Sequence, residues 1–297
     1  MILDATLFLP FEICHRTRFV QLQKRFPTTC SHYNFASLYC WQDEYRTTWQ
    51  IKDDHLMIHN GSSDILLMPH GPDLSSADLV SLSHSLRSQG MRGCIGLVPP
   101  QFLQRHPDLK QVFHFTRDED NADYIYSTSS LVELKGRKLS RKRNQVHQFL
   151  SSHPDHYCRE LFPEEWPICS SLASEWSRGR LDLPLEESPE SRALQRAFSH
   201  CRELDIHGFG LFSARQLVAF SIWSRQTDHM ATVHFEKFDP AVRGASHMIN
   251  RETARFLSSW ASWINREQDL GIPGLRRAKR SYLPERILWG YTALPVE

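Results

Sequence analysis

The sequence feature that most constrains the fold is a run of three strand candidates in close succession in the second half of the chain. Residues 209–213 and 216–224 are joined by a turn of two residues, which predicts a β-hairpin. Residues 230–238 form the third candidate, and the Asp239-Pro240 step that follows breaks the strand pattern. The succession therefore predicts an antiparallel meander of three strands.

Helices and short strands are expected on both sides of this meander. Residues 163–177 carry apolar side chains at helical spacing and end at Gly179, and Ser188 followed by Pro189 marks the start of a second helix. The other elements expected here are a strand at 156–161, a helix at 244–260, a strand at 263–265, a helix at 274–282 and a strand at 285–291. This order resembles the GNAT acetyltransferase fold, in which two helices separate the first strand from a three-strand meander.

The first half repeats this order of elements, although the two halves are not visibly similar in sequence. Its expected helices are 11–26, 31–45, 75–88 and 100–105, and its expected strands are 47–52, 55–59, 64–68, 93–98 and 111–116. A further strand candidate, 124–127, opens the second half. We therefore predict an α/β (α+β) protein of two tandem GNAT-like domains, each a mixed, mostly antiparallel sheet flanked by helices. The expected division is 1–122 and 123–297, with the active cleft in the second domain.

The composition narrows the functional classes. The formal net charge of +1 gives no general attraction to nucleic acid or acidic lipid, so an electrostatic role requires a local patch. No run of about 20 apolar residues is present, so no transmembrane segment is expected. The 7 cysteines form no C-x-x-C pair and the 16 histidines form no H-E-x-x-H pattern, so we expect reduced thiols in a cytosolic protein and no metal site.

A basic helix is expected at the entry to the second domain, over residues 138–152. Lys138 and Arg141 fall on the face opposite its apolar stripe, while Lys142 and Arg143 flank that stripe. Such a helix is anchored by its apolar side and presents cations to phosphate-bearing partners, namely a transfer RNA, a phosphoryl headgroup or a nucleotide. The alternative is a solvated basic helix between two domains.

Three stretches of sequence carry a resemblance to a known family. They are YIYS, KGRK and KRN within residues 124–144, NREQDLGIPGLRRAKRSYLP at 265–284, and the weaker NFASLYCW at 34–41. Together they resemble the C-terminal domain of bacterial phosphatidylglycerol lysyltransferases, and resemble still more the standalone cytosolic relatives of that domain. The resemblance extends from about residue 20 to 290, and its most specific part is the 265–284 block.

The resemblance implies a tandem GNAT arrangement like that of the Fem-type enzymes, which move amino acids from aminoacyl-tRNA. It implies an aminoacyl-tRNA donor, no additional cofactor, and a lipid or small-molecule acceptor. The protein is then expected in the cytoplasm or at the inner face of the membrane, in contact with a phospholipid headgroup. The chain lacks the transmembrane portion of the lipid-modifying members, which leaves the acceptor open. Two other readings remain: an acetyl-CoA-dependent N-acetyltransferase, and a GNAT-fold protein that binds a ligand without catalysis.

Acyl transfer requires a base for the acceptor, stabilisation of the carbonyl oxygen and a firm hold on the donor. His234 and Glu236 are two residues apart on an expected strand, so they share one face and are candidates for the general base. The alternative is a hydrogen-bonded pair on that strand.

The 265–284 block supplies a second set of candidates. Glu267 and Asp269 lie in a loop near Asn265, and we count both carboxylates as possible catalytic groups. Arg276 and Lys279 are three residues apart on one helix face, where they either pair with those carboxylates or bind an anionic substrate.

The loop before the helix at 244–260 occupies the place where GNAT enzymes bind the pyrophosphate of coenzyme A. The usual pattern, Gln/Arg-x-x-Gly-x-Gly/Ala, is not met. Arg243 and Gly244 still permit a phosphate to approach the backbone at the helix N-terminus, and the alternative is an ordinary helix start.

Overall fold

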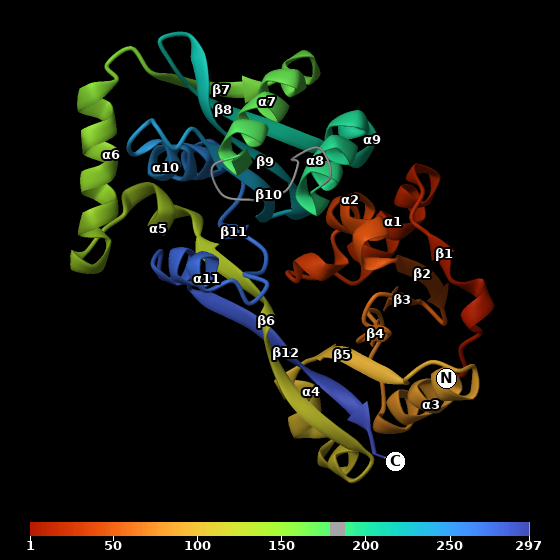
Figure 1. The fold of residues 1–297 in the computed structure, drawn as a ribbon. Helices are drawn as coiled ribbons and strands as arrows, with labels where there is room; N and C mark the ends of the chain where they lie inside the picture. The colour runs from red at the N-terminus through yellow and green to blue at the C-terminus, as the bar shows by residue number, and fades with distance from the viewer. Residues whose placement is uncertain (179–187, 297) are drawn as a thin grey trace. The chain divides into compact units, whose positions relative to one another are not determined.

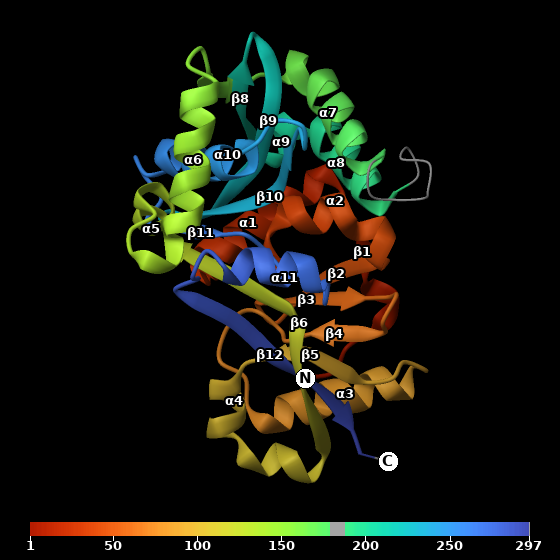
Figure 2. The ribbon, with the colours of Figure 1, turned by 60° about the vertical axis from the view of Figure 1, so that its left-hand side comes forward.

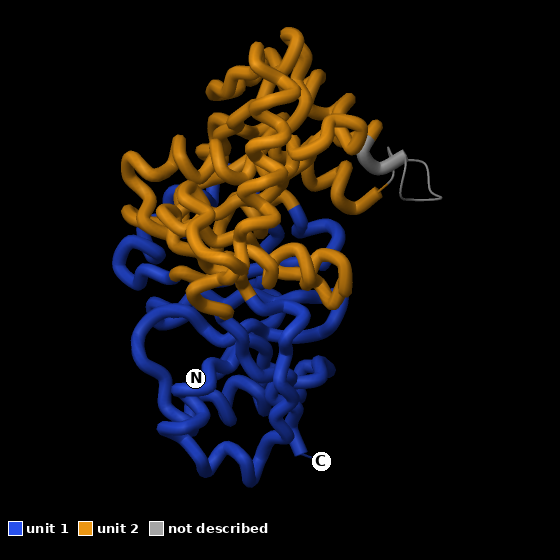
Figure 3. Tube along the Cα trace, turned by 90° about the vertical axis from the view of Figure 1, so that its left-hand side faces the viewer, with its two compact units in different colours: residues 1–28, 41–122, 288–297 blue, residues 29–40, 123–287 orange. Residues whose placement is uncertain are grey.

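The computed structural model describes residues 1–178 and 188–296, so the expected helix end at Gly179 lies outside the described residues. The chain divides into two compact units (Figure 3). Unit 1 consists of residues 1–28, 41–122 and 288–297, and unit 2 of residues 29–40 and 123–287.

Unit 1 is built on an antiparallel meander that ends in one parallel strand pair. Strands β1 to β4 pair antiparallel in sequence order, and β4 pairs parallel with β5. These strands are β1 (Leu9–Pro10), β2 (Thr47–Lys52), β3 (His55–Asn60), β4 (Ile65–Leu67) and β5 (Cys94–Val98). The helices are α1 (Arg16–Arg25), α2 (Phe35–Tyr45, whose first turns belong to unit 2), α3 (Ser76–Ser88) and α4 (Pro100–Arg105). The crossover helix α3 buries Leu79, Leu82 and Leu86 in the core of this unit.

Unit 2 repeats the plan with longer strands (Figure 1). Strands β7 to β10 pair antiparallel in sequence order, and β10 pairs parallel with β11. These strands are β7 (Tyr157–Leu161), β8 (Ile206–Ser213), β9 (Gln216–Thr227), β10 (Met230–Phe238) and β11 (Trp263–Asn265). The helices are α5 (Thr128–Glu133), α6 (Ser140–Ser152), α7 (Trp166–Arg178), α8 (Pro189–Ser199), α9 (Cys201–Leu204), α10 (Ala245–Leu257) and α11 (Pro273–Arg280). The predicted fold class of two tandem GNAT-like domains is therefore confirmed.

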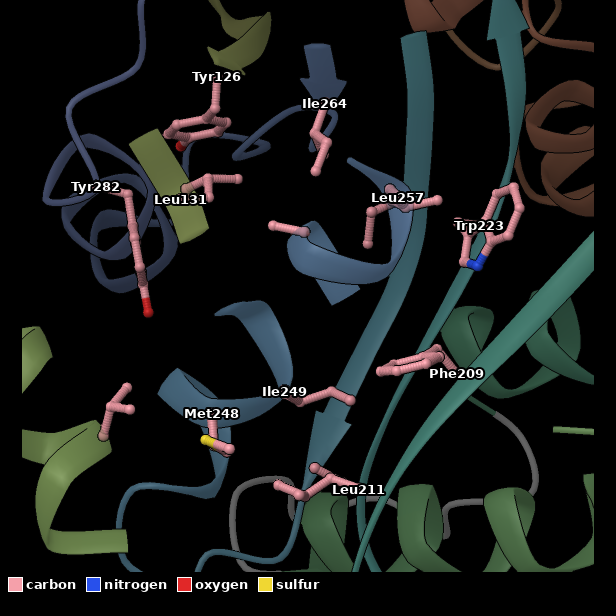
Figure 4. Close-up of a cluster of buried hydrophobic side chains, with 14 of the residues drawn as sticks. Tyr126, Leu131, Phe209, Leu211, Trp223, Met248, Ile249, Leu257, Ile264 and Tyr282 are labelled. Atoms are coloured by element: carbon pink, nitrogen blue, oxygen red, sulfur yellow. The ribbon is translucent and has the colours of Figure 1, made fainter. Parts of the chain in front are cut away.

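The core of unit 2 forms where α10 crosses the long strands. Figure 2 shows α6 and α10 on one face of β8 to β10 and α7 and α8 on the other. Met248, Ile249 and Leu257 of α10 are buried because they recur on one helical face, and they pack against strand residues such as Phe209 and Leu211 (Figure 4). This packing fixes the N-terminal end of α10 against α6, where several of the candidate residues lie.

Two strands are shared between the units, which differs from the expected division at residue 122. Strand β6 (Phe113–Ser127) begins in unit 1, and its end pairs antiparallel with β11 in unit 2. Strand β12 (Arg286–Pro295) begins in unit 2, and its later part pairs antiparallel with β5 in unit 1. Residues 29–40 also belong to unit 2. The chain therefore changes unit at 122–123 and also at points where the composition gives no signal.

The expected strands 111–116 and 124–127 are one continuous strand, β6. The charged residues between them favour a loop by composition alone, yet they stay extended because β12 lies beside them in the strand order. In unit 1 the Arg117 guanidinium also stacks 4.0 Å from the ring centroid of Trp289 on β12.

Within the described part of the chain, no helix combines the length and the apolarity needed to cross a membrane.

Candidate active site

The centre of the candidate site is His234, which lies at a β-bulge in β10. Val233 pairs with Trp223 and Phe235 pairs with Ile222, so His234 is the extra residue that has no partner on β9. Bulges of this kind redirect a side chain and are frequent beside active sites. The His234 side chain is only 3% exposed.

Both ring nitrogens of His234 are engaged. Nδ1 lies 2.7 Å from Oε1 of Glu267, and Nε2 lies 2.8 Å from Oγ of Ser224. Because a carboxylate is only an acceptor, Nδ1 carries the proton that bonds Glu267. Nε2 of the neutral ring is then the acceptor, and the Ser224 hydroxyl donates to it.

Ser224 is part of a buried polar chain on β9. Its Oγ accepts a hydrogen bond of 3.2 Å from Nδ2 of Asn34, which also donates to Gln226 at 2.9 Å. Asn34 and Ser224 are both buried. The hydroxyl therefore has a donor on one side and an imidazole acceptor on the other, which fixes its orientation.

Glu267 is held by a turn with unusual backbone geometry. Its φ is 55°, a left-handed conformation that is uncommon for glutamate. Two contacts support the turn: the Glu267 N–H donates to Oδ1 of Asn265 at 2.8 Å, and Nζ of Lys279 donates to the Glu267 carbonyl at 3.2 Å. Strained residues that the surroundings hold in place are typical of functional sites.

Asn265 and Lys279 are positioning residues in this arrangement. Asn265 is fully buried and donates to Asp123 at 2.8 Å and to the carbonyl of Thr29 at 2.9 Å. Lys279 also donates to the carbonyl of Arg266, and burial followed by the neighbouring Arg266 charge lowers the Lys279 pKa to about 8. The expectation that Lys279 pairs with a carboxylate is corrected, because its partners are backbone carbonyls.

Glu236, the second base candidate, is engaged in an ion pair. Its Oε1 accepts from the Arg266 guanidinium at 2.9 Å, and both side chains are mostly buried. Burial alone would lower the pKa of Arg266, but the Glu236 charge raises it. Glu236 therefore contacts Arg266, while His234 contacts the next residue, Glu267. Of the two base candidates, only His234 has an acceptor atom directed at a hydroxyl group.

Asp269 lies apart from His234, in a network of its own. Arg276 binds it through Nε and a terminal nitrogen, each at 2.8 Å, and the Tyr124 hydroxyl donates to it at 2.6 Å. Burial would raise the Asp269 pKa, but these hydrogen bonds hold it below its ordinary value. Its side chain is 0% exposed, so its role here is to fix the loop that precedes α11.

The four basic residues of the segment 138–152 have three different environments. Lys138 and Arg141 are exposed, as expected for the solvent face. Lys142 is half-buried, and its Nζ donates to Oγ of Ser281 at 2.6 Å. Arg143 donates to the carbonyls of Leu134 and Gly136, so it supports the turn before α6 and is not presented to a partner.

The loop at Arg243 and Gly244 is packed against α6. Gly244 has φ +88°, and a Cβ placed there would lie 2.6 Å from the carbonyl oxygen of Gln145. The following amides of Ala245 and His247 already bond carbonyls within the turn, at 3.2 and 3.1 Å. Gly244 is thus explained by helix packing, and Arg243 beside it is exposed.

The described residues contain one hollow beside α11 and one trio of potential metal ligands that bear on a cofactor or metal. A hollow of about 530 Å³ lies on α11, lined by Gly271, Pro273, Arg276, Arg277, Arg280 and Ser281. Its arginines suit an anion. One trio of potential metal ligands occurs, Glu12, Cys14 and His15, with the first two exposed and Glu12 and His15 engaged in a capping box.

Comparison with known proteins identifies the family. The profile described as phosphatidylglycerol lysyltransferase, C-terminal, matches residues 23–294. The chain belongs to this family. A curated relative, an uncharacterized protein of Mycoplasmoides gallisepticum, is 22% identical over 175 residues, and the match covers 58% of this chain and 56% of that protein. The chain therefore spans little more than half the length of that relative.

Solved structures place the fold among members of this family and the Fem proteins. A conserved protein of unknown function from Bacteroides thetaiotaomicron is 31% identical, with a TM-score of 0.88 and full coverage of both chains. L-PGS from Bacillus licheniformis is 13% identical, with a TM-score of 0.63 and coverage of 94% and 91%. FemX is 8% identical, with a TM-score of 0.61 and coverage of 97% of each chain. The last two similarities establish the fold.

Within this family fold, the site contains residues that sequence reasoning missed. Ser224, Asn34 and Arg266 are central to the geometry. Ser224 carries no motif signal, whereas Asn34 lies in the weak match at 34–41 and Arg266 in the specific block at 265–284, although the sequence assigns neither a role. A single sequence could not show that Ser224 meets His234, because that contact depends on the bulge in the pairing of β9 with β10.

Proposed function

We propose that the chain is an acyltransferase that moves an aminoacyl group from aminoacyl-tRNA to a small-molecule or lipid acceptor, with His234 as the general base. The observation that carries this proposal is the hydrogen-bonded series Ser224, His234 and Glu267, with heavy-atom distances of 2.8 and 2.7 Å. A base within reach of a hydroxyl and oriented by a third group is the pattern of an activated acyl-transfer site.

The proton path follows from the tautomer of His234, in which Nδ1 carries the hydrogen and Nε2 is the acceptor. The amine or hydroxyl of the acceptor attacks the ester carbonyl of the donor, and the tRNA ribose hydroxyl leaves. The attacking group passes its proton to the Ser224 oxygen, while the Ser224 proton moves to Nε2 of His234. The imidazolium that forms is stabilised by Glu267. The same proton returns along this path to the leaving ribose oxygen, so protons balance over the reaction.

Family membership supports the class of reaction, and the Fem-like fold supports an aminoacyl donor. The packing of Gly244 against α6 argues against a coenzyme A pyrophosphate in that loop, because two of its amides are already used. This favours aminoacyl-tRNA over acetyl-CoA. The acceptor stays a proposal at the level of an amine- or hydroxyl-bearing small molecule or lipid.

The test is deacylation of labelled aminoacyl-tRNA by the purified full chain, with mixed aminoacyl-tRNAs and with either a lipid extract or a small-metabolite extract as acceptor. We expect transfer with one of the two extracts, and a loss of about 10²–10⁴-fold in rate for His234→Gln. The matched control is His207→Gln, an exposed strand histidine that bonds Asp205 at 3.1 Å.

Two outcomes would overturn the proposal. Equal transfer rates for the native chain and His234→Gln would show that His234 is not the general base. Acyl transfer from acetyl-CoA, with none from aminoacyl-tRNA, would establish the acetyltransferase instead. A covalent acyl group on Ser224, detected by peptide mass spectrometry, would replace the relay with a nucleophile.

A further inference from the structure

A second cluster of polar groups surrounds Tyr282, on the side of α11 that meets α6 and α10. Nζ of Lys142 lies 4.1 Å from the Tyr282 ring centroid and 2.6 Å from Oγ of Ser281. Nδ1 of His247, in the first turn of α10, lies 2.6 Å from the Tyr282 hydroxyl. One aromatic side chain therefore brings a lysine and a histidine from two different helices together.

These contacts determine which ring nitrogen of His247 carries the hydrogen. Burial raises the pKa of the Tyr282 hydroxyl and outweighs the Arg266 charge, which lowers it, so the hydroxyl stays protonated and donates. Nδ1 of His247 is then the acceptor, and Nε2 carries the ring hydrogen. No partner for that Nε2–H occurs among the described residues, and the His247 side chain is only partly buried.

Among the residues that the structure describes, no carboxylate pairs with Lys142 or His247. Glu236 is the acidic neighbour, and it is taken up by Arg266 at 2.9 Å. The hydrogen-bond partner of Lys142 is a hydroxyl, and Arg141, the residue before it on α6, is exposed to solvent. Burial, then Arg266 and Arg141, lower the pKa of Lys142. Burial, then Lys142, Arg266 and Arg141, lower that of His247 to about 4. In both groups burial is the larger cause of the lowered pKa, and the neighbouring cations add to it.

We propose that Lys142, His247 and Arg141 form a phosphate-binding site at the junction of α6, α10 and α11. Two flexible cations and a fixed N–H donor are the groups that bind a phosphate through charge-assisted hydrogen bonds. Ser281 connects the cluster to the arginine-lined hollow on α11, because it both lines that hollow and accepts from Lys142. A ligand with more than one phosphate has room to continue there.

This site is distinct from the loop at 239–246, where the backbone N–H groups were expected to bind a phosphate. The cations come from α6, one turn before the Gln145 carbonyl that closes on Gly244. Helix α6 thus packs against this loop, and the side chains of α6 take the place of the loop amides as phosphate ligands. The identity of the phosphate as part of the acyl donor rests on the proposed function, whereas the anion site itself does not.

The test uses inorganic pyrophosphate as the probe and the full chain with ¹⁵N-labelled histidine. We expect saturable binding by calorimetry, with the His247 Nε2 resonance shifting and its pKa rising when pyrophosphate is bound, since an anion favours the imidazolium. Lys142→Gln should weaken binding at least about tenfold, and Lys142→Arg should restore most of it. The matched control is Lys135→Gln, an exposed lysine that pairs with Glu133 at 2.9 Å.

The outcomes separate this inference from the proposed function. Equal weakening in Lys142→Gln and Lys135→Gln, or an unmoved His247 resonance, would overturn the site. If coenzyme A or tRNA displaces pyrophosphate, the displacing molecule identifies the source of the phosphate and supports the site. If neither coenzyme A nor tRNA displaces pyrophosphate, the anion site stands, but its link to the acyl donor is overturned. His234→Gln should bind pyrophosphate normally, so a failure of the transfer assay leaves this measurement intact. A thermal melt of each variant confirms folding.

Discussion

His234 and Glu267 are separated by 33 residues in sequence, yet Nδ1 of the first lies 2.7 Å from Oε1 of the second. The contact joins a bulge in β10 to a left-handed turn after β11, and β10 and β11 are the one parallel pair in the described sheet of unit 2. The pairing of β10 with β11 ends at Thr232 and Asn265, so His234 and Glu267 each lie two residues beyond the last pair. The catalytic proposal depends on this junction.

Replacing Glu267 with glutamine is expected to lower the rate of acyl transfer by about 10²-fold while leaving the fold intact. Glutamine retains a hydrogen-bond acceptor for Nδ1 of His234 but has no charge to stabilise the imidazolium. The measurement is the transfer rate beside a thermal melt. Glu165→Gln is the control, because Glu165 pairs with Arg159 at 2.6 Å elsewhere in unit 2. Similar rates for the two variants would contradict a catalytic role for the carboxylate.

Replacing Lys279 with methionine is expected to remove a component of the pH dependence of stability. Burial lowers the Lys279 pKa from 10.5 to about 8, so between these values the unfolded chain binds the proton and the folded chain does not. Stability from this group therefore rises with pH, by roughly 1.4 kcal/mol per unit and at most ~3 kcal/mol. The free energy of unfolding in urea, measured at pH 7, 8, 9 and 10, should increase for the native chain relative to Lys279→Met. A constant difference would show that Lys279 titrates normally in the fold.

Much of the fold could be predicted from the sequence because its helices and strands carry regular patterns. The strand at 230–238 matches β10, and Ser188 caps α8 by accepting from the N–H of Ser191 at 3.1 Å. The passage of β6 and β12 from one unit to the other could not be predicted, because pairing between strands more than a hundred residues apart leaves no local signal in the sequence.

The candidate site was predictable where spacing alone brings residues together. Arg276 does lie on the helix face that meets Asp269. The partner of His234 could not be predicted, since it depends on the backbone turn at Glu267 and on a bulge. At Gly244 the sequence left a phosphate loop and an ordinary helix start both open, and the close packing against α6 could not be predicted from it.

Replacing Gly244 with alanine is expected to destabilise unit 2 by about 2–3 kcal/mol. The left-handed φ of +88° costs an alanine on the order of 1–2 kcal/mol, and the new Cβ would lie 2.6 Å from a backbone oxygen that cannot move away freely. Gly274→Ala is the control, since no atom lies within 4 Å of its built Cβ and the position is inside α11. There alanine should be neutral or stabilising by up to about 1 kcal/mol. Equal effects in chemical denaturation would disprove the packing role of Gly244.

Replacing Asp269 with asparagine is expected to destabilise the protein by about 3 kcal/mol near neutral pH, because Arg276 loses its two-bond partner in a buried setting. The pKa of Asp269 is lowered in the fold, since the hydrogen bonds from Arg276 and Tyr124 outweigh the burial that would raise it. Its contribution is therefore fully present above the ordinary carboxyl pKa and is lost as the pH falls through the lowered value. The stability difference between the native chain and Asp269→Asn should shrink as unfolding is measured at decreasing pH below 5.

The exposed pair of Arg25 and Asp54 provides the comparison that isolates burial as the cause. It is also joined by two hydrogen bonds, of 3.0 and 2.9 Å, but its side chains are 59% and 51% exposed. Asp54→Asn should destabilise the protein far less than Asp269→Asn, because solvent screens an exposed ion pair. If both variants lost the same small amount, the Asp269 network would be an ordinary surface pair in solution, and the rigid support assigned to the loop before α11 would have to come from other contacts.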